Sequence, residues 1–149
     1  MGQYADKAVQ LFKEGYNWSQ AVFAAFADRY GIDHELALRL SASFGGGMGR
    51  MREVCGAVSG MLMVAGLETG AADGADREGK AANYAEVQEL AGLFREENGS
   101  IVCRELLGLN QRDGMESLIP EQRTKNYYQK RPCVELVRYA ARLLEERYS

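Results

Sequence analysis

Apolar side chains recur every three or four residues along most of the chain, which is the spacing of amphipathic helices. Residues that end or begin helices separate the apolar segments. Gly15, Gly31, Gly99 and Gly108 are placed to end them, Asn17, Asp33 and Ser100 to cap the next ones, and Pro132 to open the last. No alternating pattern typical of a strand persists. The sequence therefore predicts an all-α fold, with helices over residues 4–14, 18–30, 34–44, 53–67, 80–98, 101–107 and 132–148.

We expect the other helices to pack around residues 53–67, which are apolar nearly all round, as in a buried helix. Four glycines precede this segment: Gly45, Gly46, Gly47 and Gly49. Glycines at this density favour a loop with positive φ, or a backbone that another group approaches closely. Gly56 and Gly60 share one helix face, where another backbone or a ligand could approach beside Cys55. The simpler alternative is a tight turn into a buried helix with one inert thiol.

The remaining stretches are expected to connect helices or to cover the bundle. Residues 70–79 are small, polar and rich in glycine, which indicates a long connection. Residues 110–131 are polar and irregular, with a helical pattern only over 121–129. The 80–98 helix is expected to lie on the surface and to face inward through Tyr84, Val87, Leu90, Ala91 and Phe94. With no internal repeat, we expect one domain over residues 1–149, a compact bundle of about six or seven helices.

Composition excludes several classes of protein. The formal net charge of −3 argues against nucleic acid as the main partner. The longest apolar run, residues 61–67, is too short to span a bilayer, and the first residues lack the apolar core of a secretory signal. Three cysteines are an odd number and a low density, which fits a reducing cytoplasm better than a disulfide framework. We therefore expect a cytoplasmic protein.

The three cysteines share a setting near the starts of predicted helices. Cys55 follows the glycines, Cys103 would be the third residue of its helix and Cys133 the second residue of the last helix. A helix N-terminus and a nearby cation both stabilise a thiolate, the reactive form of cysteine. Each cysteine has basic neighbours in sequence: Arg50 and Arg52, then Arg104, then Lys130 and Arg131 with Arg123 and Lys125. The alternative is that these long side chains simply point to solvent.

The spacing of residues excludes several specific sites. No Cys-x-x-Cys pair is present, so a thioredoxin-type motif and covalent haem attachment are both excluded. His34 is the single histidine and stands at a predicted helix start, where a solvated or capping role is expected. Residues 45–49 are not a phosphate-binding loop, because the Gly-Lys-Ser/Thr ending is missing and a helix precedes them.

Four blocks of the sequence together resemble a known family. Residues 44–49 read FGGGMG, 55–60 read CGAVSG, 100–108 read SIVCRELLG, and Cys133 opens the last helix. In this order they resemble the bacterial and archaeal C_GCAxxG_C_C family of redox-active proteins, over residues 8–144. The family name implies a fourth cysteine in an Asn-Cys-x-Gln-Ala-Val block, which here reads NWSQAV. Trp18 therefore stands where the first cysteine would be, which argues against chemistry that needs four thiolates.

The leading functional interpretation is a cytoplasmic redox-active protein, acting by thiol–disulfide chemistry or by binding a cofactor. Cys55, Cys103 and Cys133 would converge near the glycine loop, with Cys55 as nucleophile or first ligand and one of the others as resolving thiol or second ligand. A cofactor would contact Gly45, Gly46, Gly47, Gly49, Gly56 and Gly60. The first alternative is a metal ion or iron–sulfur cluster held by the three thiolates with one open position. The second is a helical interaction module, such as a homodimer, without catalytic activity. The sequence leaves open which cysteines pair, whether the protein is an enzyme, and which redox partner or small molecule it meets.

Overall fold

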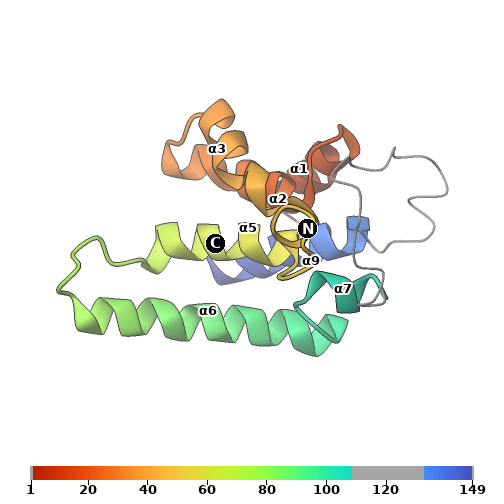
Figure 1. The fold of residues 1–149 in the computed structure, drawn as a ribbon. Helices are drawn as coiled ribbons and strands as arrows, with labels where there is room; N and C mark the ends of the chain where they lie inside the picture. The colour runs from red at the N-terminus through yellow and green to blue at the C-terminus, as the bar shows by residue number, and fades with distance from the viewer. Residues whose placement is uncertain (1, 109–132, 149) are drawn as a thin grey trace.

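The computed structural model describes residues 2–108 and 133–148 (Figure 1). The elements are, in chain order, α1 (Gln3–Lys13), α2 (Trp18–Phe26), the 3₁₀ turn η1 (Ala27–Tyr30), α3 (His34–Ser41), the 3₁₀ turn η2 (Ala42–Phe44), the short turn α4 (Gly45–Met48), α5 (Gly56–Thr69), α6 (Arg77–Asn98), α7 (Cys103–Leu106) and α9 (Cys133–Arg147). Over these residues, β-structure is limited to one isolated antiparallel bridge between Val54 and Val102. The all-α prediction is confirmed.

Helix α5 lies at the centre of the bundle, as predicted for the apolar segment, but it begins at Gly56 and not at residue 53. It contacts α2, α6 and α9, and Figure 1 shows α6 running beside it with α1 to α3 gathered on the opposite side. The side chains of Val58, Met61 and Val64 are fully buried. Helix α1 packs against both α2 and α9, so the beginning and the end of the chain meet on one side of the core.

Local signals placed most helix ends correctly. Asn17 caps α2 in a reciprocal capping box with Gln20, and Asp33 caps α3 by accepting from the backbone N–H of Leu36. Gly31 and Gly99 follow helices with φ of 69° and 91°, the left-handed backbone that glycine adopts without strain. The predicted 18–30 and 34–44 helices each end in a 3₁₀ turn, η1 and η2 respectively.

The prediction for the surface helix was wrong in two details. Helix α6 begins at Arg77 rather than at residue 80, because Asp76 caps it by accepting from the backbone N–H of Gly79. Tyr84 was expected to face inward but is 59% exposed. The inward face instead continues back from Leu90 to Asn83, whose side chain donates to the hydroxyl of Thr69 on α5 at 2.9 Å.

The start of α7 also differs from the prediction. Helix α7 begins at Cys103 and not at residue 101, because the backbone of Val102 is extended in its bridge with Val54. Ser100 still binds this turn, accepting from the backbone N–H of Val102 at 2.9 Å. Helix α9 is described from Cys133 onward. The predictions for residues 110–131 and Pro132 lie outside the described residues.

The end of α9 is tied to its neighbours by charged and phenolic groups. Arg147 forms ion pairs with Glu86 and Glu89 of α6. Burial raises the pKa of the Tyr148 phenol from its usual 10.0 to about 12, and the negative charge of Glu86 adds to the effect. A pKa that is raised on folding contributes stability below the unfolded-state value, and this contribution is lost as pH rises through the folded-state value.

We therefore expect the free energy of unfolding to fall as pH rises from 10 towards 12, the interval set by Tyr148. Tyr148→Phe should remove part of this fall, which urea unfolding monitored by circular dichroism would measure on either side of pH 10. Tyr84→Phe removes an exposed phenol of α6 and is the matched control for the substitution itself. An identical alkaline slope in Tyr148→Phe and in the unchanged protein would contradict the prediction.

Candidate functional site

The glycine-rich segment forms a turn of left-handed backbone between α3 and α5. Gly46, Gly47, Met48, Gly49 and Arg50 follow one another with φ of 70°, 72°, 67°, 64° and 67°. Backbone hydrogen bonds hold the turn, with Gly49 donating to Gly45 at 2.9 Å and Glu53 donating to Gly47 at 2.9 Å. The predicted positive φ is confirmed for three of the four glycines but not for Gly45, whose φ is −66°, and two non-glycine residues of the turn share it. Each costs roughly 1–2 kcal/mol in this conformation, so the surrounding structure must hold the turn in place.

The Val54–Val102 bridge and the two backbone hydrogen bonds beside it, here called the ladder, place the Cys55 and Cys103 segments side by side. The backbone N–H of Cys55 donates to Ile101 at 2.8 Å, and that of Cys103 donates to Glu53 at 2.5 Å, on either side of the Val54–Val102 bridge. Cys55 and Cys103 are thus diagonal neighbours across the ladder, a relation that typically separates Cα atoms by about 7–8 Å. The structure therefore joins the segments of two of the three predicted cysteines. That one cysteine pair lies within bonding distance stays a prediction.

The sulfur of Cys103 has a buried cationic neighbour. Nη1 of Arg52 donates to Sγ of Cys103 at 3.6 Å, and the exposed fractions of the two residues are only 7% and 2%. Arg52 reaches this position from a backbone with φ of 60°, and its carbonyl accepts from the N–H of Arg104 at 3.2 Å. The guanidinium therefore places a fixed positive charge beside the sulfur. Because α7 spans 4 residues, its aligned peptide dipoles add little to this positive charge.

The structure places the basic residues beside partners that the sequence did not indicate. Arg52 was expected to serve Cys55, its neighbour in sequence, and the structure shows it in contact with Cys103 across the ladder. Arg104 was the cation expected near Cys103, and its guanidinium instead forms an ion pair with Glu53 at 2.8 Å. Sequence reasoning missed the Arg52–Cys103 contact because a pairing between distant segments leaves no local signal in the sequence.

Gly47 lies directly against Cys103. A Cβ atom built on Gly47 would be 2.7 Å from Cβ of Cys103 and 2.8 Å from the backbone nitrogen of Glu53. These distances are shorter than van der Waals contact, so only glycine fits between the turn and the cysteine. The left-handed turn therefore closes one side of the Cys103 site.

The glycine face of α5 is covered by α2. A Cβ on Gly56 would meet the backbone nitrogen of Ser19 at 3.1 Å and Cβ of Trp18 at 3.2 Å, and one on Gly60 would meet the backbone oxygen of Ser19 at 2.8 Å. Either another backbone or a ligand was expected at this face, and the structure shows the backbone of α2 there. That a cofactor contacts the six glycines named from sequence stays a prediction. Trp18, which replaces the first cysteine of the family pattern, is buried beside the residue that follows Cys55.

A polar network fixes the start of α2 against the chain that enters the glycine turn. The side chain of Asn17 accepts from the N–H of Gln20 at 2.9 Å and donates to the carbonyl of Ala42 at 3.0 Å. The buried hydroxyl of Ser19 donates to the carbonyl of Ser41 at 2.7 Å. The polar residues of the NWSQAV block therefore have a structural role, because they hold the segment that leads to Gly45.

The two functions of Asn17 can be separated by substitution. Asn17→Asp keeps the oxygen that caps α2 but loses the donor to Ala42, whereas Asn17→Ala loses both. We expect Asn17→Ala to lower the free energy of unfolding by about 2 kcal/mol and Asn17→Asp by about half of that, measured by urea unfolding. Equal losses in the two variants would show that the cap contributes nothing to stability.

The other residues named from sequence are placed less fully. His34 is exposed at the first residue of α3, as expected for a solvated side chain. Cys133 begins α9, while its side chain and the basic cluster at residues 123–131 lie outside the described part of the chain. Across the described residues, no group of three histidine, cysteine or acidic side chains could hold a metal ion. A site with three thiolates would need Cys133.

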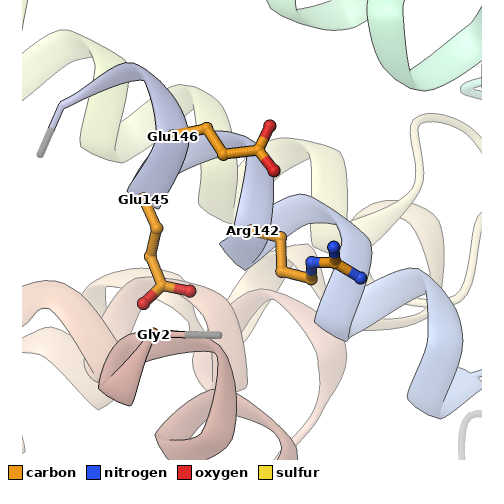
Figure 2. Close-up of a pocket in the computed structure, with 4 residues that line it drawn as sticks. All are labelled: Gly2, Arg142, Glu145 and Glu146. Carbon is orange, nitrogen blue, oxygen red and sulfur yellow. The ribbon is translucent and has the colours of Figure 1, made fainter.

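A cavity of about 160 Å³ lies elsewhere, at the start of α1 (Figure 2). Figure 2 shows the carboxylate of Glu145 pointing from α9 towards Gly2, with Arg142 and Glu146 beside it. The carboxylate accepts from the backbone N–H groups of Tyr4 and Ala5 at 3.1 and 3.2 Å. Glu145 therefore caps α1 from the opposite end of the chain, and this cavity has a structural explanation.

Over the described ranges, 2–108 and 133–148, no helix combines the length and the apolar character needed to cross a membrane. Residues 16–147 match a family model described as Putative redox-active protein (C_GCAxxG_C_C). No curated protein and no solved structure matches the chain. The matched range contains the left-handed turn, the ladder and all three cysteines.

Proposed function

Because the chain belongs to the C_GCAxxG_C_C family of redox-active proteins, we propose that it carries out thiol redox chemistry at Cys103 and Cys55, with Cys133 as the third thiol. The contact between the buried guanidinium of Arg52 and the sulfur of Cys103 is the observation that supports this most. A positive charge fixed beside a sulfur stabilises the negative charge that the sulfur carries when it reacts as a nucleophile.

The arrangement supports a division of roles between the sulfurs. Cys103 has the cation and is the attacking sulfur in this proposal, in place of Cys55, which was expected from sequence. Cys55 and Cys133 are the two candidates for the resolving thiol. Cys55 is favoured by the ladder, which holds its segment beside that of Cys103. The low cysteine count supports a reducing compartment such as the cytoplasm, where an external dithiol would return the disulfide to two thiols.

The test is the pattern of disulfide formation in reduced protein. After treatment with oxidised glutathione or, in a parallel sample, with the small thiol oxidant diamide, the unchanged protein should form one intramolecular disulfide that includes Cys103, located by peptide mapping in a mass spectrometer. Cys103→Ser should abolish this disulfide, one of Cys55→Ser and Cys133→Ser should also abolish it, and the other should retain it. Three thiols that stay reduced in the folded protein would refute the proposal.

Metal analysis of the same preparation, purified without oxygen, separates the main alternative. Stoichiometric metal that is lost in each of the three serine variants would favour a three-thiolate metal site instead. Reduced thiols without bound metal would favour the interaction module.

A further inference from the structure

We propose that the oxidant at this site is a small hydroperoxide, which the sulfur of Cys103 attacks directly with Arg52 as its catalytic partner. The inference rests on the proposed thiol function and adds the class of substrate. Two observations carry it: the burial of the thiols, and the position of the guanidinium at the reacting atom.

Access to the sulfurs favours a small oxidant. Cys55 is fully buried, Cys103 is 2% exposed, and the backbone of Gly47 lies against Cβ of Cys103. In thiol–disulfide exchange the attacking sulfur must reach a sulfur of the substrate, so a protein disulfide or oxidised glutathione needs a wide opening of the fold. The reacting end of a hydroperoxide is two oxygen atoms, so it needs a smaller opening of the fold than a disulfide does.

The guanidinium of Arg52 can stabilise the negative charge on the sulfur before the reaction and on the departing oxygen after it. The thiolate of Cys103 attacks the terminal oxygen of the hydroperoxide, and a sulfur–oxygen bond forms while the oxygen–oxygen bond breaks. The sulfur loses two electrons, and the departing alkoxide takes up the proton that the thiol released on ionisation, giving an alcohol, or water from hydrogen peroxide. Negative charge thus moves from sulfur to oxygen within reach of one fixed cation, which stabilises both forms.

The sulfenic acid formed on Cys103 then has a thiol with which to react. Condensation with Cys55 or Cys133 forms the disulfide and releases one molecule of water, so the product is the disulfide that the proposed function requires. Reduction by an external dithiol would complete the cycle.

The experiment measures the rate at which Cys103 of pre-reduced protein reacts with hydrogen peroxide, with the sulfenic acid trapped by dimedone and located by mass spectrometry. Folded protein should react at least about tenfold faster than the same cysteine in urea-unfolded protein. Arg52→Met should lower the rate by about tenfold or more. Methionine is tolerated by backbone like that of Arg52, since Met48 has a φ of 67°. Arg39→Met is the control, because Arg39 is exposed on α3 outside the site, and it should change the rate less than about twofold.

The outcomes separate this inference from the proposed function. If oxidised glutathione forms the Cys103 disulfide but peroxide reacts no faster with folded than with unfolded protein, the hydroperoxide inference is overturned and thiol chemistry stands. If neither reagent acts, both fail. If Arg52→Met does not fold, the unchanged protein still tests the inference. Because the sulfurs are buried, its reaction rates should fall as the oxidant becomes larger, from hydrogen peroxide to cumene hydroperoxide to oxidised glutathione. The reverse order would overturn the inference.

Discussion

Replacing Gly47 with alanine is expected to lower the free energy of unfolding by about 3 kcal/mol and to displace Cys103. The new Cβ atom would lie 2.7 Å from Cβ of Cys103, 2.8 Å from the nitrogen of Glu53 and 2.9 Å from Cα of Arg52. None of these atoms is the flexible end of a side chain, so relief requires the turn and the ladder to separate. Urea unfolding would measure the stability, and the alkylation rate of Cys103 would report the opening of the site.

Gly49→Ala is the matched control two residues along the same turn. Gly49 has a φ of 64°, close to the 72° of Gly47, but the nearest atom to its added Cβ is a backbone oxygen of Ser43 at 3.7 Å. The control therefore carries the backbone strain without the close contact and should cost about 1 kcal/mol. If both variants lost equal stability, the contact between Gly47 and Cys103 would have no energetic weight, and the turn could not be said to close the site.

Features set by neighbouring residues could be predicted from the sequence. Asn17 and Asp33 cap helices through a backbone group three residues away, and Gly31 and Gly99 end helices through their own φ. The buried character of α5 was also predictable, because its apolar residues cover the whole circumference of the helix. These signals act within a single turn, so one sequence is enough to recognise them.

Contacts between distant segments were not predictable in the same way. The bridge joins Val54, which precedes α5 in the chain, to Val102, which follows α6, and neither residue is part of a strand pattern. This bridge delays the start of α7 to Cys103 and places Arg52 beside the Cys103 sulfur. The sequence could name the cysteines and the arginines but could not say which cation belonged to which thiol, because that depends on tertiary pairing.

The error at Tyr84 has a related cause. Tyr84 and Asn83 are adjacent residues about 100° apart around α6, and hydrophobicity favoured the tyrosine as the inward residue. The structure turns Asn83 inward because Thr69 on α5 offers its side chain a hydrogen-bond partner. A polar residue can therefore occupy an inward position where its partner comes from another helix, and the hydrophobic pattern of one helix cannot reveal this.

Two glycines of α5 are expected to respond to alanine with changes of opposite sign in the free energy of unfolding. Gly66→Ala should raise the free energy of unfolding by about 0.5–1 kcal/mol, because nothing lies within 4 Å of the added Cβ and alanine favours the helix.

Gly60→Ala makes the same chemical change two turns earlier but should lower the free energy of unfolding by about 2 kcal/mol. Its Cβ would lie 2.8 Å from the backbone oxygen of Ser19 and 3.1 Å from Cβ of Val22, so α2 would have to move away from α5. That movement would also disturb the network of Asn17 and Ser19 that holds the entry to the glycine turn. Thermal and urea unfolding of the two variants would measure the difference. A Gly60→Ala protein as stable as Gly66→Ala would show that α2 yields without cost, and the close packing of α2 on α5 would then have no part in holding the thiol site.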